Sequence, residues 1–235
     1  LLPRHYLADN AQPLLQAYIG EYLKEEIIAE AITRNVPAFA RFLEASAFSS
    51  GQMVNYQNVA QECGVSAVTA KQYFQILTDT LIGRFIPAFQ KRPKRRVIQS
   101  PRFYFFDIGI ANYLLKRGTI EFHSENFGRA FEQFIFQELI AYSHYSGKNF
   151  DISYWRTTSQ LEVDFILGDH EVAVEVKASK NVGLQHCRGL RAFDEEYKTK
   201  QSIFVSLDPR PRLVDKLHIL PWEDFLEKLW SGKII

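Results

Sequence analysis

Two acidic residues and a lysine stand on neighbouring segments with strand-like patterns in the second half of the chain. The segment 161–167 (LEVDFIL) contains Asp164, and the segment 171–177 (EVAVEVK) contains Glu175 and Lys177. A Gly-Asp-His turn separates the two segments, which predicts a β-hairpin. Because side chains alternate between the faces of a strand, Glu175 and Lys177 share one face.

The length of the turn decides which residue lies opposite Asp164. A two-residue or a four-residue loop sets Asp164 directly opposite Glu175. A three-residue loop sets it opposite Val174, on the other face, unless a bulge intervenes. In the even-loop register the Cβ atoms of opposed residues lie ~5 Å apart. This register predicts that Asp164, Glu175 and Lys177 gather on one face of the hairpin.

Such a group could bind a divalent cation, since two carboxylates at this distance repel each other unless a positive charge lies between them. Mg²⁺ prefers carboxylates, backbone carbonyls and water, so Asp164, Glu175 and the carbonyl of Val176 are candidate ligands. Lys177 could orient or deprotonate a water, or stabilise charge on a phosphate. The alternative is a surface salt bridge of the acids with Lys177. Both segments are mostly apolar, which indicates buried strands and favours a site.

This spacing resembles the PD-(D/E)XK nuclease superfamily, whose signature is an acid on one strand, an acid-x-Lys on the next and often a Glu on a preceding helix. Asp164 matches the first acid, Glu175-Val176-Lys177 matches the second element, and Glu132 in GRAFEQFIFQEL matches the helical acid. Val163 replaces the familiar proline. The resemblance implies Mg²⁺ or Mn²⁺ as the metal, with Glu132 as a further ligand, directly or through water. Lys177 would then position the attacking water.

Upstream of the hairpin, residues 55–82 predict a helix-turn-helix. Tyr56–Cys63 has the pattern of a short helix, and Gly64 is a candidate C-cap. Ser66 is a candidate N-cap for a second helix. Strand-like segments follow on either side of a basic stretch, so the whole resembles a winged helix.

The basic stretch between those strands is a candidate nucleic-acid contact. From Arg84 to Arg102 the chain has seven basic residues and no acidic one. Such a cluster can neutralise phosphates on a DNA surface. The alternatives are a solvated hairpin tip or a surface that docks on an acidic domain. The predicted nucleic-acid-binding residues, including one lysine after the hairpin, are Lys91, Arg92, Lys94, Arg95, Arg96 and Lys180.

Composition and missing motifs exclude several other classes of protein and of functional site. The chain has 235 residues, 46% of them hydrophobic, and 28 Lys+Arg balance 27 Asp+Glu, which excludes wholesale disorder. It contains no phosphate-binding GxxxxGK[ST] loop, no GxSxG and no HExxH. Two distant cysteines exclude a CxxC zinc site and favour a reducing cytoplasm. No apolar stretch approaches the roughly 18 residues of a membrane span.

The motifs, in their order along the chain, are similar to the C-terminal portion of prokaryotic AAA-type ATPases that end in domain of unknown function 4143. The resembling segments are LLQAYIGEYLKEEI, the helix-turn-helix, RFYFFDIGIANYLL, GRAFEQFIFQELIAY, YWRTTSQLEVDFIL, VAVEVKAS and LPWEDFLEKLW. The resemblance implies an ATPase domain that is missing from this chain, followed by a winged helix and a nuclease-like domain.

We therefore expect an α/β (α+β) fold in which a helical and winged-helix part precedes a mixed sheet flanked by helices. Residues 217–220 have the pattern of a short edge strand. The expected divisions are a helical segment leading from the ATPase, the winged helix, and the nuclease-like domain, at 1–48, 49–118 and 119–235.

The predicted function is metal-dependent phosphodiester hydrolysis with binding of nucleic acid, DNA more than RNA. The alternative is a catalytically silent module that binds DNA, a protein or the ATPase. ATP would enter only through the ATPase domain. A second copy of the chain is a further candidate partner, and no membrane is expected to be one.

Overall fold

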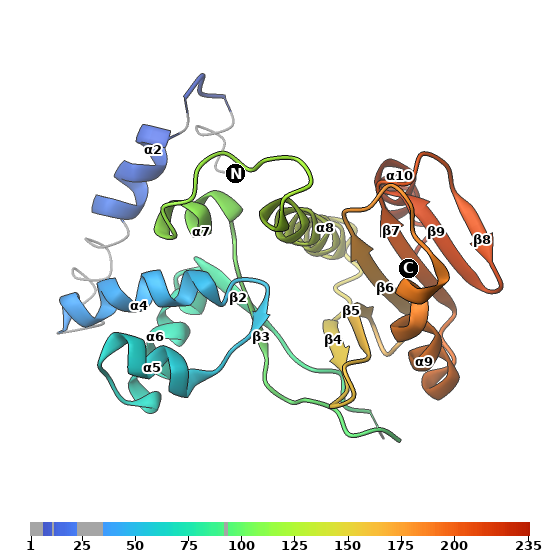
Figure 1. Ribbon diagram of the computed structural model, residues 1–235, viewed down its shortest axis with the longest axis horizontal. Coiled ribbons are helices and arrows are strands. Elements are labelled where there is room, and N and C mark those ends of the chain that lie inside the picture. The colour runs from blue at the N-terminus through green and yellow to red at the C-terminus, as the bar shows by residue number, and fades with distance from the viewer. Residues whose placement is uncertain (1–6, 11, 23–34, 92–93) are drawn as a thin grey trace. The chain divides into compact units, whose positions relative to one another are not determined.

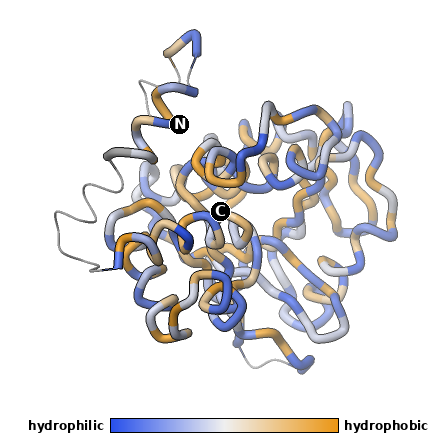
Figure 2. The backbone as a smooth tube through the Cα atoms, turned by 60° about the vertical axis from the view of Figure 1, so that its left-hand side comes forward, coloured by the Kyte–Doolittle hydropathy of each residue, from blue (hydrophilic) through white to orange (hydrophobic). Residues whose placement is uncertain are grey.

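A computed structural model gives the arrangement of the chain (Figure 1). The residues that it describes are 7–10, 12–22, 35–91 and 94–235. Hydrophobic residues recur along the whole described tube in Figure 2, and they supply buried clusters to two separate parts of the chain. These parts are an N-terminal unit, residues 1–85 and 102–120, and a C-terminal unit, residues 86–101 and 121–235.

The N-terminal unit is mainly helical and contains a three-stranded sheet in the order β1-β3-β2. From α4 onward its elements follow in the order helix, strand, two helices and two strands. Part of the first expected helical segment, residues 23–34, lies outside the described residues. The elements are α2 (Gln12–Ala17), the π-helical turn η1 (Tyr18–Tyr22), α4 (Val36–Phe48), β1 (Gln52–Met53), α5 (Tyr56–Cys63), α6 (Ala67–Asp79), β2 (Gly83–Ile86), β3 (Arg102–Phe105) and α7 (Ile108–Leu114).

The helix-turn-helix is α5 and α6, and its turn has the predicted caps. Gly64 ends α5 with a left-handed φ of 68°, a conformation that glycine adopts without a Cβ penalty. Ser66 begins α6, where its side chain accepts a hydrogen bond from the backbone N–H of Thr69 at 3.0 Å. These two caps stop one helix and start the next within three residues.

Helix α4 belongs to the same core as the helix-turn-helix. The ring of Phe42 lies 4.8 Å from that of Phe74 and 5.3 Å from that of Tyr73, both on α6. We expected residues 1–48 to form a separate linking segment, but α4 is part of this unit. The reason is its apolar face, which buries Phe39, Phe42 and Leu43.

The C-terminal unit is built on a six-stranded mixed sheet in the order β4-β5-β6-β7-β9-β8. The pairs β6–β7 and β7–β9 are parallel, whereas the other three pairs are antiparallel. The α+β fold class is therefore confirmed. The elements are α8 (Glu125–Tyr145), β4 (Ile152–Arg156), β5 (Glu162–Leu167), β6 (Val172–Lys177), the 3₁₀ turn η2 (Leu184–Cys187), α9 (Arg188–Tyr197), β7 (Gln201–Ser206), β8 (Arg212–Val214), β9 (Leu217–Pro221) and α10 (Trp222–Trp230).

Helices α8 and α9 cover opposite faces of this sheet (Figure 1). On one face Phe136 of α8 stacks on Phe165 of β5, with ring centroids 5.5 Å apart. On the other, Phe193 of α9 packs against Trp155 of β4. Gly189 lets α9 approach closely, because a Cβ atom there would lie 1.8 Å from the carbonyl oxygen of Glu162. None of the helices in the described ranges is both long enough and apolar enough to span a membrane.

Residues 86–101, here called the arm, extend the edge of this sheet. The arm forms a parallel bridge at Ala88 and Tyr154 of β4 and an antiparallel bridge at Val97 and Thr157. Its Phe89 is buried in the core cluster of this unit. We expected the arm to lie within a winged-helix domain, 49–118, but these backbone bridges and Phe89 group it with the C-terminal unit.

Candidate functional site

The β5–β6 hairpin has the even-loop register. The paired residues run from Leu167 and Val172 through Ile166 and Ala173 to Phe165 and Val174, which leaves a four-residue loop. These pairs end one residue short of Asp164 and Glu175, which would form the next pair if the register continued. The register that places Asp164 opposite Val174 is therefore wrong.

Strand β5 is irregular at Asp164. On the β4 side, Ser153 pairs with Ile166, but Trp155 pairs with Val163. Two residues of β5, Asp164 and Phe165, thus oppose a single residue of β4, which is the geometry of a β-bulge. Bulges re-aim side chains and occur often beside active sites.

The side chain of Asp164 is tied to the backbone of β6. It is only 6% exposed, and its Oδ2 accepts a hydrogen bond from the N–H of Val176 at 2.8 Å. Val176 is the middle residue of the Glu175-Val176-Lys177 motif. The first acid of the predicted pattern therefore contacts the second element of the pattern directly.

The remaining predicted site residues lie on β6 and α8. Glu175 is half-buried, whereas Lys177, the last residue of β6, is exposed. Glu132 is half-buried on α8, a helix that packs against β6. Within the described residues, no three His, Cys, Asp or Glu side chains form a group that could hold a metal ion. The structure thus links Asp164 to the Glu175-Val176-Lys177 motif through Val176, while Glu132 does not complete a three-ligand group with the two acids.

His186 is a further residue near Lys177 that the sequence analysis did not single out. Burial, together with the positive charge of Lys177, lowers the pKa of His186 below its usual value. Its Nδ1 accepts a hydrogen bond from the N–H of Gly183 at 3.1 Å, which requires that nitrogen to be unprotonated. No spacing motif involves this histidine, so only the folded chain identifies it. The neighbouring Gln185 is exposed, and its amide lies against Gly183.

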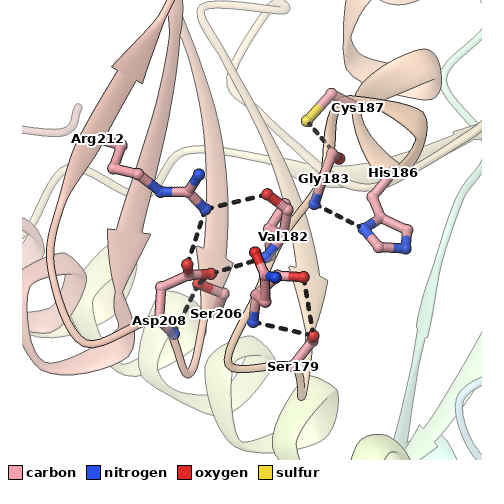
Figure 3. A network of polar contacts seen from close by, with 9 residues as sticks. Ser179, Val182, Gly183, His186, Cys187, Ser206, Asp208 and Arg212 are labelled. Carbon is pink, nitrogen blue, oxygen red and sulfur yellow. Dashed lines mark hydrogen bonds and ion pairs between the residues drawn. The ribbon is translucent and has the colours of Figure 1, made fainter.

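A buried carboxylate holds the loop that follows Lys177 (Figure 3). Oδ2 of Asp208 accepts hydrogen bonds from the N–H of Val182 at 3.2 Å and the hydroxyl of Ser206 at 2.8 Å. Its Oδ1 pairs with the guanidinium of Arg212 at 2.7 Å, and the same guanidinium donates to the carbonyl of Val182. The loop between β6 and α9 is therefore fixed to the segment that follows β7.

Part of the predicted nucleic-acid-binding segment is engaged within its own unit. Nη1 of Arg95 donates to Oε2 of Glu196 at 2.7 Å and to the carbonyl of Ala192 at 3.0 Å. The ammonium of Lys91 pairs with Asp169. These contacts join the basic segment to acidic residues of the unit to which it belongs.

The other predicted basic residues differ in their surroundings. The side chains of Lys94 and Arg96 are exposed, and Arg92 lies outside the described residues. Lys180 is also exposed, and its Nζ lies 5.4 Å from the centroid of the Phe122 ring. None of these positions tests the predicted contact with nucleic acid, which stays a prediction.

Burial and hydrogen bonding act in opposite directions on Glu196, which anchors the arm. Burial raises the pKa of its carboxyl, but hydrogen bonds from the backbone N–H of Lys94 and the side chain of Arg95 outweigh burial and lower it. The Lys94 N–H lies 2.5 Å from Oε1. Glu196 is therefore stabilised as a carboxylate by the arm.

Comparison with known proteins gives families without an assigned function. The family model described as Domain of unknown function (DUF8612) matches residues 2–121. The one described as Domain of unknown function (DUF4143) matches residues 127–225. No solved structure matches the chain.

Two curated proteins are similar to this chain. They are Uncharacterized protein Mb2031c of Mycobacterium bovis and Uncharacterized protein Rv2008c of Mycobacterium tuberculosis. Each is 25% identical over 150 residues, which covers 63% of this chain and 33% of the relative. The chain thus spans about a third of the length of the curated relatives that it matches.

Proposed function

We propose, for a chain that belongs to the family described as Domain of unknown function (DUF8612), that the C-terminal unit is a nuclease-like domain. Its reaction would be the hydrolysis of phosphodiester bonds with the help of a divalent cation. The observation that carries the proposal is the hydrogen bond that Asp164 accepts from the backbone N–H of Val176, the middle residue of the acid-x-Lys motif.

The order of elements supports the same proposal. Helix α8 precedes the antiparallel strands β4, β5 and β6, and α9 then leads to β7, which is parallel to β6. This places an acidic helix, an acidic strand and the acid-x-Lys strand in the order of the PD-(D/E)XK signature. The bulge at Asp164 adds a local distortion of the kind that occurs beside active sites.

The donor set fits a small divalent cation. Mg²⁺ binds through one or two carboxylates and retains several waters, so the pair Asp164 and Glu175 suffices. The carbonyl of Val176 and, through water, Glu132 would complete the set. When bound, Mg²⁺ or Mn²⁺ would supply Lewis acidity to the scissile phosphate.

Lys177 has the position to act on the substrate. It ends β6 two residues after Glu175, and its side chain is exposed. Its ammonium would hold the attacking water and stabilise the negative charge that develops on the phosphate. His186, whose lowered pKa favours the neutral form near neutral pH, adds no competing positive charge beside this lysine.

We propose that DNA, more than RNA, contacts the arm through Lys94 and Arg96, whose side chains are exposed. Lys91 and Arg95 would have to exchange their acidic partners for phosphates to join them. Replacing Lys94 and Arg96 together by Ala should weaken DNA binding and flatten its dependence on salt, since each lost phosphate contact lowers the slope by about one. Replacing Lys216 and Lys228, which are exposed elsewhere on this unit, is the matched control. Equal affinity of the two double variants would contradict the role of the arm.

A silent binding module is the second candidate function. Two observations on the described residues favour it: the acids do not form a three-ligand group, and the arm is docked on acidic residues of its own unit. In this case the unit would bind DNA, a protein or an ATPase domain without cleaving anything.

Mn²⁺-dependent cleavage of linear, supercoiled and single-stranded DNA separates the two candidates. The parent chain is compared with Glu175→Gln and with Glu227→Gln, an exposed glutamate on α10. If the unit is a nuclease, the parent and Glu227→Gln both cleave DNA, and Glu175→Gln does not. Absence of cleavage in all three, at high protein concentration and with several metals, would favour the silent module.

We further propose that this chain works with an AAA-type ATPase domain, in the cytoplasm. The resemblance of its ordered motifs to such proteins supports the first part. The curated relatives are about three times as long as the aligned region, which gives room for a further domain in those proteins. The free cysteines Cys63 and Cys187, both buried, support a reducing compartment.

A further inference from the structure

An apolar pocket of about 720 Å³ opens at one end of the sheet in the C-terminal unit. Strands β6, β7 and β9 are parallel neighbours, so their carboxyl ends lie at the same edge. The pocket is lined by residues that lie within three positions after the end of each strand, among them Lys180, Leu207 and Trp222. Ligands of open sheets bind outside the carboxyl ends of parallel strands.

The pocket and the candidate catalytic residues share this end of β6. Lys177 is the last residue of β6, and Lys180 follows it by three residues. The opposite wall comes from α8, where Phe131 and Phe134 line the pocket on either side of Glu132 in the sequence. Lys180, rather than Lys177, is the lysine at this end of β6 that lines the pocket.

Aromatic side chains form much of the pocket wall. Phe134 lies across from Trp222 with ring centroids 5.8 Å apart, and it is 37% exposed. Phe122 and Phe127 form a second pair, 4.6 Å apart. Exposed aromatic faces bind flat rings, and nucleobases stack on them without regard to sequence.

The polar groups at the pocket match the rest of a nucleotide. Lys180 is its single cation among the described lining residues, and an ammonium there can contact a phosphate. Glu223 and Asp224, in the first turn of α10, provide carboxylate acceptors for the amino groups of bases. The third acid, Asp208, is already engaged by Arg212 and Val182.

We infer that this pocket takes an unpaired nucleobase that carries an exocyclic amino group, from a single-stranded nucleic acid whose backbone passes Lys180 toward Lys177. The inference rests on the proposed function and names its substrate class, because a base in a duplex is not available for such a pocket without being unpaired. A basic amphipathic peptide would also suit the acids and the apolar wall, whereas Lys180 favours a ligand that carries a phosphate, so peptide binding is made an outcome of the test.

Binding is measured by fluorescence anisotropy in the presence of EDTA, so that cleavage and affinity are separated. The probes are labelled oligo-dA, oligo-dT and abasic strands of about 12 nucleotides, together with a duplex of the same length. The proteins are the full chain, Phe134→Ala and Tyr145→Ala, which removes an 84% exposed aromatic from the same helix.

The inference expects oligo-dA to bind more tightly than oligo-dT, the abasic strand or the duplex. Phe134→Ala should weaken oligo-dA binding about tenfold, as loss of one stacked base does, and leave the abasic strand unaffected. Tyr145→Ala should bind as the parent. Equal binding of oligo-dA and the abasic strand, or unchanged affinity in Phe134→Ala, would overturn the inference.

Two further outcomes separate this inference from the proposed nuclease activity. If Phe134-dependent binding of oligo-dA occurs without Mn²⁺-dependent cleavage, the pocket stands and the nuclease proposal fails. If a lysine-rich amphipathic peptide binds through Phe134 while no oligonucleotide binds, the pocket is a peptide groove and the inference is overturned.

Discussion

The backbone N–H of Val176 donates a hydrogen bond to Oδ2 of Asp164 at 2.8 Å, across the two strands that carry the candidate site. A side chain thus takes the place of a strand carbonyl at the point where β5 bulges. The contact both positions the carboxylate and stabilises the hairpin, and these two roles can be separated by substitution.

Asp164→Asn and Asp164→Ala should differ in stability but not in metal binding. Asn retains an oxygen that can accept the Val176 N–H, so its free energy of unfolding should stay within about 1 kcal/mol of the parent. Ala leaves that buried N–H without its acceptor, which costs about 1–3 kcal/mol. Urea unfolding measures the difference, and calorimetry should show that both variants lose Mn²⁺ affinity. Equal destabilisation by Asn and Ala would show that the hydrogen bond from Val176 contributes nothing to the free energy of unfolding.

The hairpin was predictable from the sequence because its physics is local. A strand alternates its side chains with a period of two, and a short loop restricts the register to a few choices. The sequence therefore predicted an even-loop register, and the pairs from Leu167 with Val172 to Phe165 with Val174 have it. The caps at Gly64 and Ser66 were predictable for the same reason, since each acts on the backbone a few residues away.

The place of the arm was not predictable, because it depends on partners about a hundred residues away. Nothing near Arg95 in the sequence indicates that Glu196 will accept its hydrogen bonds. The position of β9 in the sheet depends on its pairing with another strand, which the pattern of its own residues does not reveal. The sequence indicated an edge strand at 217–220, but β8, which is short and mostly exposed, pairs with β9 and becomes the edge. His186 likewise comes near Lys177 only through the turn η2.

The arm should loosen in acid through Glu196. The pKa of this carboxyl is lowered in the folded state, below the value of about 4.3 for an unperturbed glutamate. Its contribution to stability is thus complete above that value and is lost as pH falls through the lowered pKa. The protection factor of the Phe89 amide, whose N–H donates to the carbonyl of Tyr154 at 2.7 Å, should fall over that range once the intrinsic exchange rate at each pH is divided out.

Substitution of Glu196 tests the same contact at neutral pH. Glu196→Gln removes the charge from a side chain that is 1% exposed, and it should destabilise the arm by about 1–3 kcal/mol. Glu195→Gln is the control, since Glu195 is 71% exposed and lies 3.4 Å from Arg95, a pair worth at most about 1 kcal/mol. Exchange at Phe89 that responds equally to both substitutions would contradict the anchoring role of Glu196.

Gly189→Ala should destabilise the C-terminal unit. The new Cβ would meet the carbonyl oxygen of Glu162 at 1.8 Å, so α9 or β5 must shift, at a cost of about 1–3 kcal/mol or more. Gly128→Ala on α8 is the control, because no atom lies within 4 Å of its Cβ position. Alanine there should stabilise the helix by about 0.5–1 kcal/mol. The urea midpoint should fall in Gly189→Ala and rise in Gly128→Ala. A Gly189→Ala variant as stable as the parent would show that α9 does not approach β5 this closely.

Asp208→Asn should free the loop that leads from Lys177 to α9. The carboxylate accepts two hydrogen bonds and pairs with Arg212, and an amide cannot satisfy all three donors. The free energy of unfolding should fall by about 2–3 kcal/mol, and exchange at the Val182 N–H should accelerate. Asp215→Asn is the matched control, since Asp215 pairs with Arg191 at 2.9 Å on the surface, and it should cost less than about 1 kcal/mol. Because the loop also carries Lys180, the Asp208 variant should bind oligo-dA more weakly than the Asp215 variant does. If the Val182 N–H stays protected from exchange in Asp208→Asn, the loop is held by Arg212 alone.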